Sequence, residues 1–121
     1  MAAGLILFAH GARDAAWADP FQRLLGLVRE AAPGHDVSLA FLERMQPTLR
    51  EAAASMVQAG ARAIRIVPVF LGQGGHVRQD LPAMIESLRS AHPGVDIYCA
   101  APVGEDDTVL RAIVGYCLRQ L

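Results

Sequence analysis

Short apolar runs and amphipathic segments alternate four times along this chain. The runs cover residues 5–9, 37–42, 64–71 and 95–101, and each has the length and composition of a buried strand. Between and after them, apolar residues recur at helical spacing, and each set marks one buried helix face: Phe21, Leu24, Leu25 and Val28; Leu49, Ala52, Ala53, Met56 and Val57; Leu81, Met84, Ile85 and Leu88; Val109, Leu110, Ile113, Val114 and Cys117. Right-handed crossovers join strands that alternate with helices, and the strands then run parallel. The pattern therefore predicts one α/β domain over residues 1–121, with a four-stranded parallel sheet flanked by helices.

Turn-forming residues mark the ends of the expected helices. The start signals are Asp19-Pro20, Pro47, Asp80 with Pro82, and Asp106 to Thr108, and the stop signals are Gly34, Gly60 and Gly94. Residues 31–37 and 91–97 resemble one another, which either a shared turn geometry or a duplication would explain. Pro68 cannot donate to a sheet ladder, so it predicts a bulge or an early end of the third strand.

The charge of the chain is nearly balanced. Eleven basic and twelve acidic residues give a formal charge of -1, which provides no attraction for nucleic acid or an anionic membrane. We therefore expect neither partner. Every basic residue is an arginine, so Schiff-base chemistry on lysine is excluded and an anion site would use guanidinium groups, which suit carboxylates and phosphates.

The two cysteines do not match a zinc-binding pattern, and the first residues do not match a signal peptide. Cys99 and Cys117 lie in apolar stretches outside zinc-binding spacings, so we expect two buried thiols. Residues 1–9 lack the basic region of a signal peptide, and no apolar run approaches the ~18 residues that span a bilayer. We expect a cytoplasmic protein.

Polar side chains follow three of the expected strands. His10 comes after the first strand, Glu43 after the second, and His76 lies in the loop after the third. A flavodoxin-like strand order, 2-1-3-4, puts them at the carboxyl edge beside the switch point where ligands bind. Two imidazoles and a carboxylate suit both a first-row metal ion and proton transfer. His35 and His92 fall at the opposite edge, where a role in stability is usual.

The loop after the third strand is rich in glycine. Gly72, Gly74 and Gly75 flank Gln73 and precede His76, and glycine lets the backbone approach a large or flat ligand closely. Neither a Gly-x-Gly-x-x-Gly motif nor the ending of a P-loop is present, so we expect no nucleotide.

Arginines fall near the same edge. Arg13, Arg44 and Arg78 follow His10, Glu43 and His76 closely, which indicates a ligand with several carboxylates, although solvated surface arginines are the alternative. We expect Asp14 and Asp80 to be local caps or partners of Arg13 and Arg78, and Trp17 to be a packing anchor or a pocket wall.

Four segments together resemble a known family, the small single-domain CbiX-type sirohydrochlorin cobaltochelatases. They are His10-Gly11-Ala12-Arg13-Asp14, then Phe41-Leu42-Glu43 with Pro47, then the segment from Pro68 to Pro82, and finally Pro102-x-Gly104-x-Asp106-Asp107. The third segment is the most specific. The resemblance covers essentially the whole chain.

The resemblance implies a class II chelatase with a chelatase-like fold. Such an enzyme is a homodimer that inserts Co²⁺ into sirohydrochlorin for cobalamin biosynthesis without ATP; Fe²⁺ or Ni²⁺ stay open as the metal. By position, His10 and His76 would bind the metal and His10 would accept a proton. Gln46 and the loop Leu71, Gly72, Gln73, Gly74 and Gly75 would line the tetrapyrrole site, and Arg13, Arg44 and Arg78 would match its carboxylates.

Two residues depart from the family pattern. Ala12 stands where the family usually has Ser, and Gln46 stands where related chains often have an acidic residue. If a carboxylate takes part in deprotonation, Glu43 would have to serve.

Three other functions stay open. A siroheme-type ferrochelatase would insert Fe²⁺ instead. A noncatalytic metal- or tetrapyrrole-binding module would keep the fold without turnover, and Ala12 and Gln46 favour it. A histidine phosphatase is the weakest alternative, since its chemistry needs an arginine directly before the histidine and this chain has Ala9.

Overall fold

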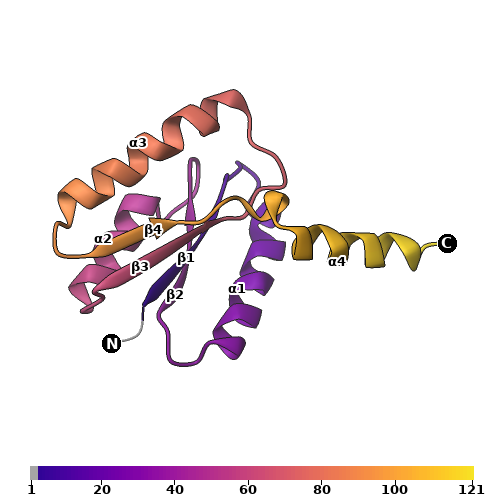
Figure 1. The fold of residues 1–121 in the computed structure, drawn as a ribbon, viewed down its shortest axis with the longest axis horizontal. Helices are drawn as coiled ribbons and strands as arrows, with labels where there is room; N and C mark the ends of the chain where they lie inside the picture. The colour runs from indigo at the N-terminus through magenta and orange to yellow at the C-terminus, as the bar shows by residue number, and fades with distance from the viewer. Residues whose placement is uncertain (1–2) are drawn as a thin grey trace.

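The computed structural model describes residues 3–121, which form a parallel sheet with helices on both faces (Figure 1). The elements are β1 (Gly4–Ala9), the 3-10 turn η1 (Ala15–Ala18), α1 (Asp19–Ala31), β2 (Val37–Phe41), α2 (Leu49–Gln58), β3 (Ala63–Pro68), α3 (Gly75–Ala91), β4 (Asp96–Cys99), the 3-10 turn η2 (Val103–Glu105) and α4 (Asp107–Leu118). The strand order is β2-β1-β3-β4 and all three pairings are parallel. The predicted fold class is confirmed.

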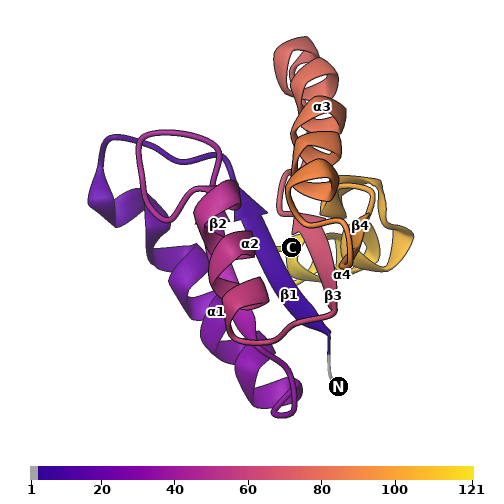
Figure 2. The same cartoon turned by 90° about the vertical axis from the view of Figure 1, so that its left-hand side faces the viewer.

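The sheet separates two apolar layers. Ile6 and Phe8 of β1 pack with residues of α2 and α3, whereas Leu7 and Ala9 pack with residues of α1. Successive side chains of a strand point to opposite faces of the sheet, so neighbouring residues of β1 pack in different layers. Figures 1 and 2 show α3 and α1 on opposite sides of the sheet. The carboxyl ends of the strands are left at one edge, where the site residues lie.

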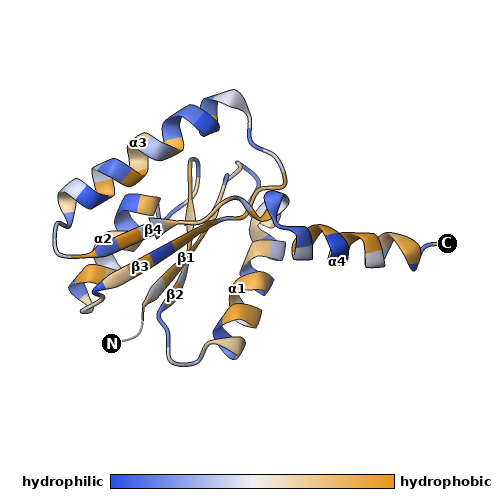
Figure 3. Ribbon diagram, viewed as in Figure 1, coloured by the Kyte–Doolittle hydropathy of each residue, from blue (hydrophilic) through white to orange (hydrophobic). Residues whose placement is uncertain are grey.

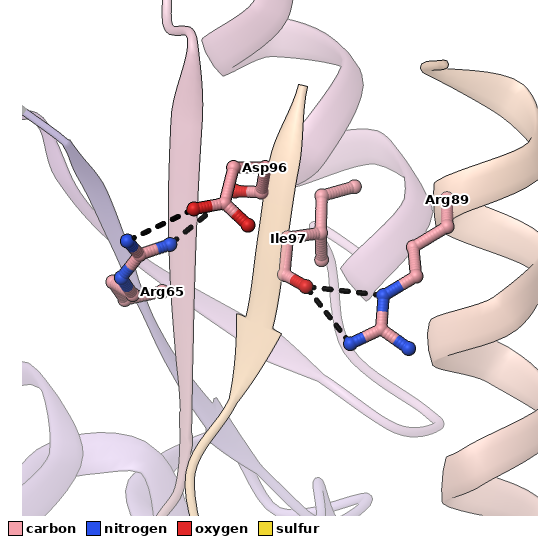
Figure 4. A network of polar contacts seen from close by, with 4 residues as sticks. All are labelled: Arg65, Arg89, Asp96 and Ile97. Carbon is pink, nitrogen blue, oxygen red and sulfur yellow. Dashed lines mark hydrogen bonds and ion pairs between the residues drawn. The ribbon is translucent and has the colours of Figure 1, made fainter. Parts of the chain in front are cut away.

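Two arginines fasten helices to strands in the same way. Arg89 of α3 donates from Nε and Nη2 to the carbonyl oxygen of Ile97 at 3.1 and 2.9 Å (Figure 4). Arg29 of α1 donates through the same two nitrogens to the carbonyl oxygen of Val37 at 3.0 and 2.7 Å. The similar turns at 31–37 and 91–97 therefore share one geometry.

The third helix begins earlier than the sequence signals predict. Asp80 and Pro82 were the expected start, but α3 begins at Gly75 and contains Pro82. The earlier turn buries Val77 beneath the helix in line with Leu81 and Ile85, and this added apolar contact explains the longer helix. His76 consequently lies in the first turn of α3 and not in a loop. The strand before it, β3, ends at Pro68, as its missing N–H predicts.

The fourth helix does not bury the face predicted for it. None of the residues of α4 is buried, and Leu110, Ile113 and Val114 are exposed. Figure 1 shows α4 extending away from the sheet. The apolar spacing correctly predicts a helix, but periodicity does not reveal what covers its apolar face.

The two thiols lie in different environments. Cys117 is exposed on α4, so the prediction of two buried thiols is wrong for it, again because α4 leaves the sheet. Cys99 is half-buried on β4, where burial raises the pKa of its thiol and the nearby Arg89 guanidinium lowers it.

Within residues 3–121, no helix combines the length and apolar character needed to cross a membrane.

Candidate functional site

His10 and Glu43 meet at the carboxyl edge of the sheet. The pairing of β1 with β2 continues past the strand ends, since the Leu42 N–H donates to the Ala9 carbonyl at 2.9 Å and the Glu43 N–H donates to the His10 carbonyl at 3.1 Å. The two side chains are thereby brought together, with His10 Nε2 3.5 Å from Glu43 Oε1 and relative exposures of 50% and 47%. A half-exposed imidazole beside a carboxylate can exchange both protons and metal ions with an incoming ligand.

Gly11 makes this meeting possible. Its φ is +97°, and a Cβ on residue 11 would overlap the carbonyl oxygen of Glu43. A side chain would therefore be strained by the backbone angle and would also push the Glu43 segment away from His10. The first turn after β1 depends on glycine at this position.

The second oxygen of Glu43 contacts the next residue. Arg44 has a φ of 64° and donates from Nε to Glu43 Oε2 at 3.2 Å. Because Arg44 occupies Oε2, Oε1 is left facing His10. This arginine therefore helps to orient the carboxylate.

Phe70 supports the other side of His10. The two ring centroids are 6.5 Å apart in an edge-on arrangement, and Phe70 is itself buried against Phe8 at 5.9 Å. Sequence reasoning placed Phe70 inside the third strand and missed this neighbour of His10. Pro68, which ends the strand two residues earlier, was the available signal.

The glycine loop leaves unfilled space above the sheet edge. A Cβ on Gly72, Gly74 or Gly75 would meet no atom within 4 Å, and none of the three has a positive φ. Packing within this chain and backbone conformation therefore do not explain these glycines. Leu71 beside them exposes 65% of its surface. The loop presents an unobstructed and partly apolar surface.

His76 forms a second, separate pair. Its Nε2 lies 2.9 Å from Asp80 Oδ2, one helical turn further along α3, and its side chain is 87% exposed. The sequence suggested that Asp80 is a local cap or a partner of Arg78. In the structure Asp80 pairs with His76 instead, because residues four apart share a helix face.

The other predicted residues are distributed around this edge. Arg13, Arg44 and Arg78 are exposed. Gln73 and Arg78 line a cavity of about 400 Å³ between α3 and β4, whereas Gln46 lines one of about 230 Å³ on the α1 side of β2. Gln46 therefore lies in a different cavity from Gln73 and Arg78.

Two neighbours of the first turn have structural roles. Asp14 accepts a hydrogen bond from the Ala16 N–H at 3.0 Å and caps η1, as predicted. Trp17 packs on Phe21 with ring centroids 4.6 Å apart, which is the role of a packing anchor.

Metal-ligating side chains occur in pairs. No group of three His, Cys, Asp or Glu residues able to hold a metal occurs within residues 3–121. The structure joins His10 with Glu43 and His76 with Asp80, and it does not assemble all of them into one cluster. Two ligands hold a metal ion weakly and leave coordination positions free, which suits a metal that is passed on and not retained.

The parallel α/β fold and the exposed His10–Glu43 pair fit an α/β protein of the chelatase class. The CbiX family model matches residues 4–116, and the chain belongs to that family of metal-inserting enzymes. The predicted family is confirmed.

Relatives and solved structures agree with this assignment. The sirohydrochlorin cobaltochelatase of Sulfurisphaera tokodaii is 30% identical over 91% of this chain and 87% of its own length. The sirohydrochlorin ferrochelatase of Bacillus subtilis is 33% identical over 62% of this chain, which spans only 29% of that relative. The crystal structure of a protein described as a cobalamin (vitamin B12) biosynthesis CbiX protein from Marinobacter aquaeolei VT8 superposes with a TM-score of 0.82 and 33% identity, covering 98% of both chains. SirB from Bacillus subtilis with Fe³⁺ gives a TM-score of 0.77 and 28% identity, covering 95% of this chain and 46% of that one.

Proposed function

We propose that this protein is a sirohydrochlorin cobaltochelatase, which inserts Co²⁺ into sirohydrochlorin without ATP in cobalamin biosynthesis. The half-exposed pair of His10 Nε2 and Glu43 Oε1, 3.5 Å apart at the carboxyl edge of the sheet, is the observation that carries the proposal. Membership of the CbiX family supports it.

Metal insertion exchanges two protons for one ion. The two pyrrole N–H groups of the macrocycle each lose a proton as the metal binds, so the enzyme must accept protons and deliver M²⁺ at one place. A neutral imidazole does both, since its usual pKa of about 6.5 lies near physiological pH. His10 would bind the metal through its neutral imidazole and, once the ion has passed to the macrocycle, accept one of the two protons; that proton would pass to Glu43, so that His10 could accept the second.

His76 is proposed as the second metal ligand. Asp80 lies 2.9 Å from His76 Nε2, so it can orient the ring as carboxylates commonly do for ligating histidines. With at most a few weak ligands, the ion keeps positions free for the four macrocycle nitrogens.

The remaining predicted residues would bind the tetrapyrrole. Exposed arginines match its carboxylates, and the glycine loop with Leu71 matches its flat apolar face. In this proposal the substrate contacts are Arg13, Arg44, Gln46, Leu71, Gly72, Gln73, Gly74, Gly75 and Arg78.

Cobalt is favoured by the lengths of the relatives. The sirohydrochlorin cobaltochelatases of Sulfurisphaera tokodaii and Methanocaldococcus jannaschii are covered over 87% and 94% of their lengths. The ferrochelatases of Bacillus subtilis and Priestia megaterium are covered over only 29% and 41%. Relatives of about the same length as this chain therefore include proteins named cobaltochelatases. Fe²⁺ insertion is the second candidate, because sirohydrochlorin ferrochelatases are also among the relatives.

We also propose that two copies act together. The chain spans 46% of SirB, so that longer protein contains a further region of similar length. A second copy would supply the corresponding half and cover a macrocycle too large for one copy to enclose.

The cytoplasmic location expected from the sequence stays a prediction.

The test compares enzymatic with spontaneous metallation. Sirohydrochlorin and Co²⁺ are mixed with and without protein, and the visible absorption change is followed; a parallel anaerobic reaction uses Fe²⁺. We expect acceleration with Co²⁺, its loss in His10→Ala, and its retention in His35→Ala at the opposite sheet edge. Tight tetrapyrrole binding with equal rates in the presence and absence of protein would show a noncatalytic binding module instead.

A further inference from the structure

The cavity between α3 and the edge strand β4 has a volume of about 400 Å³, which is in the range of small-molecule sites. Figure 3 shows that apolar and hydrophilic residues alternate along α3. The helical wall of the cavity consists of residues that recur at the three- and four-residue spacing of one helix side: Arg78, Leu81, Pro82, Ile85, Glu86 and Arg89. The cavity therefore has both apolar and charged walls.

Part of the cavity wall is apolar. Leu81 and Ile85 line it and are buried in the core beneath α3. Cys99, at the end of β4, lines the same cavity, and burial raises the pKa of its thiol, which therefore stays uncharged near neutral pH. An apolar part of a ligand would be more stable against these side chains than in water.

The two arginines of the cavity differ in what they already bind. Arg89 donates to the Ile97 carbonyl (Figure 4), and it also donates to Glu86 Oε1 at 2.6 Å. The charges of Arg89 and Glu86 therefore largely cancel. The guanidinium of Arg78 forms no ion pair with any residue in 3–121. The cavity thus has one positive charge available for an anion, at its Arg78 end.

Arg78 and His76 project from different sides of α3. Residues two apart on an α-helix point about 200° apart around its axis, and His76 pairs with Asp80 whereas Arg78 lines the cavity. One ligand can contact both side chains only if it extends across the first turn of α3. A broad macrocycle with carboxylates on its rim has this shape.

The cavity reaches the glycine loop. Gln73 lines it and lies between Gly72 and Gly74, where a Cβ would meet no atom within 4 Å. Strand β3 separates β1 from β4, so the ends of β1 and β4 lie two strand spacings apart, about 10 Å. A macrocycle whose metal is held by His10, which follows β1, would therefore present its rim and not its centre to β4.

We infer that this cavity receives one carboxylate-bearing edge of the tetrapyrrole, whose carboxylate binds Arg78 while the apolar part of the edge packs on Leu81 and Ile85. Holding one edge fixes the rotation of the macrocycle about its metal, so the cavity would set the orientation of the substrate. The inference rests on the proposed function, because it takes sirohydrochlorin as the ligand.

A separate carboxylic acid with an apolar body has the same chemistry as this edge of the tetrapyrrole. The tetrapyrrole is favoured because the cavity is continuous with the loop at Gln73, beside the space in which the macrocycle is proposed to lie. The experiment below distinguishes the two sources.

Cys99 reports whether the cavity is occupied. In a Cys117→Ser protein it is the single thiol, and its alkylation by iodoacetamide is followed by mass spectrometry with and without metal-free sirohydrochlorin. At a ligand concentration about ten times the Kd, the rate should fall roughly tenfold, because only the unoccupied protein reacts. Arg78→Glu should lose most of this protection at the same concentration. Arg62→Glu is the matched control, since it makes the same charge change at an exposed position before β3, at the opposite edge of the sheet.

The second measurement is the Kd of metal-free sirohydrochlorin, followed by its visible absorption. Arg78→Glu should raise the Kd roughly tenfold or more, the usual effect of losing a charge-assisted hydrogen bond, and Arg78→Lys should recover part of the affinity because it keeps the charge. Protein already alkylated at Cys99 should also bind more weakly, since the added group occupies the cavity. Circular dichroism must show that every form is folded.

Three results would overturn the inference. Equal alkylation rates with and without sirohydrochlorin, in a protein that binds and metallates it, would show that the substrate leaves the cavity empty, and the proposed function would stand. Protection of Cys99 by phenylpropionate but not by sirohydrochlorin would assign the cavity to a separate carboxylic acid. A protein that does not bind sirohydrochlorin at all would refute the proposed function together with the inference.

Discussion

His10 follows β1 and Glu43 follows the neighbouring strand β2, and their side chains lie 3.5 Å apart because the pairing of the two strands continues two residues beyond the end of β2. The contact joins a potential metal ligand to a potential proton acceptor.

Replacing Glu43 with Gln should lower kcat for metallation by roughly 10- to 100-fold, the range found when a group that orients a metal-ligating histidine is removed. The amide preserves the shape of the side chain but neither accepts a proton nor stabilises a charged imidazole. The KM for sirohydrochlorin should change little. Steady-state kinetics with Arg50→Gln, an exposed position on α2, provide the comparison; a Glu43→Gln enzyme with wild-type kcat would remove Glu43 from the mechanism.

Gly11→Ala should destabilise the fold by roughly 1–3 kcal/mol, because the methyl group would have to occupy the place of the Glu43 carbonyl at a φ of +97°. Urea unfolding followed by circular dichroism measures the change. Gly94→Ala is the control, since a Cβ there meets no atom within 4 Å. Equal stabilities of the two variants would contradict the role given to Gly11.

Gly72→Val should leave the stability of the fold nearly unchanged but raise the KM for the tetrapyrrole. The new side chain would extend into space that is empty in the chain itself, where the macrocycle is proposed to lie. Unfolding curves and KM values, measured on the same preparation, separate the two effects. A normal KM in a folded Gly72→Val protein would show that the substrate does not approach this loop.

Cys99 should react slowly with iodoacetamide near pH 8. Burial raises the pKa of its thiol, so less of the reactive thiolate is present at a given pH than for an ordinary cysteine. In a Cys117→Ser protein, where Cys99 is the single thiol, the rate should rise at higher pH than it does for the same protein unfolded in guanidinium. Coincident profiles would mean that burial does not control this thiol.

The sequence predicted local structure well wherever neighbouring residues along the chain determine it. Alternation of apolar runs and amphipathic segments predicted the four strands and the four helices, and Pro68 predicted the end of β3. The strand order followed from assigning these elements to a flavodoxin-like sheet and not from neighbouring residues. The start of α3 was misjudged by five residues, because burial of Val77 and not the Asp80 signal sets it. His10 and Glu43 could be assigned to one edge, since every strand of a parallel sheet ends there.

Distances and partners across the molecule required the tertiary structure. Only folding reveals that Glu43 turns one oxygen to His10, that Asp80 pairs with His76, and that Phe70 supports the His10 ring. The apolar stripe of α4 was evident from the sequence, but its outward path was not. That path depends on Gly104 fitting against Leu71, a contact between residues 33 positions apart. Periodicity over a few residues predicts which segments form helices and strands. What covers the apolar face of a helix depends on contacts with residues that are distant in the sequence.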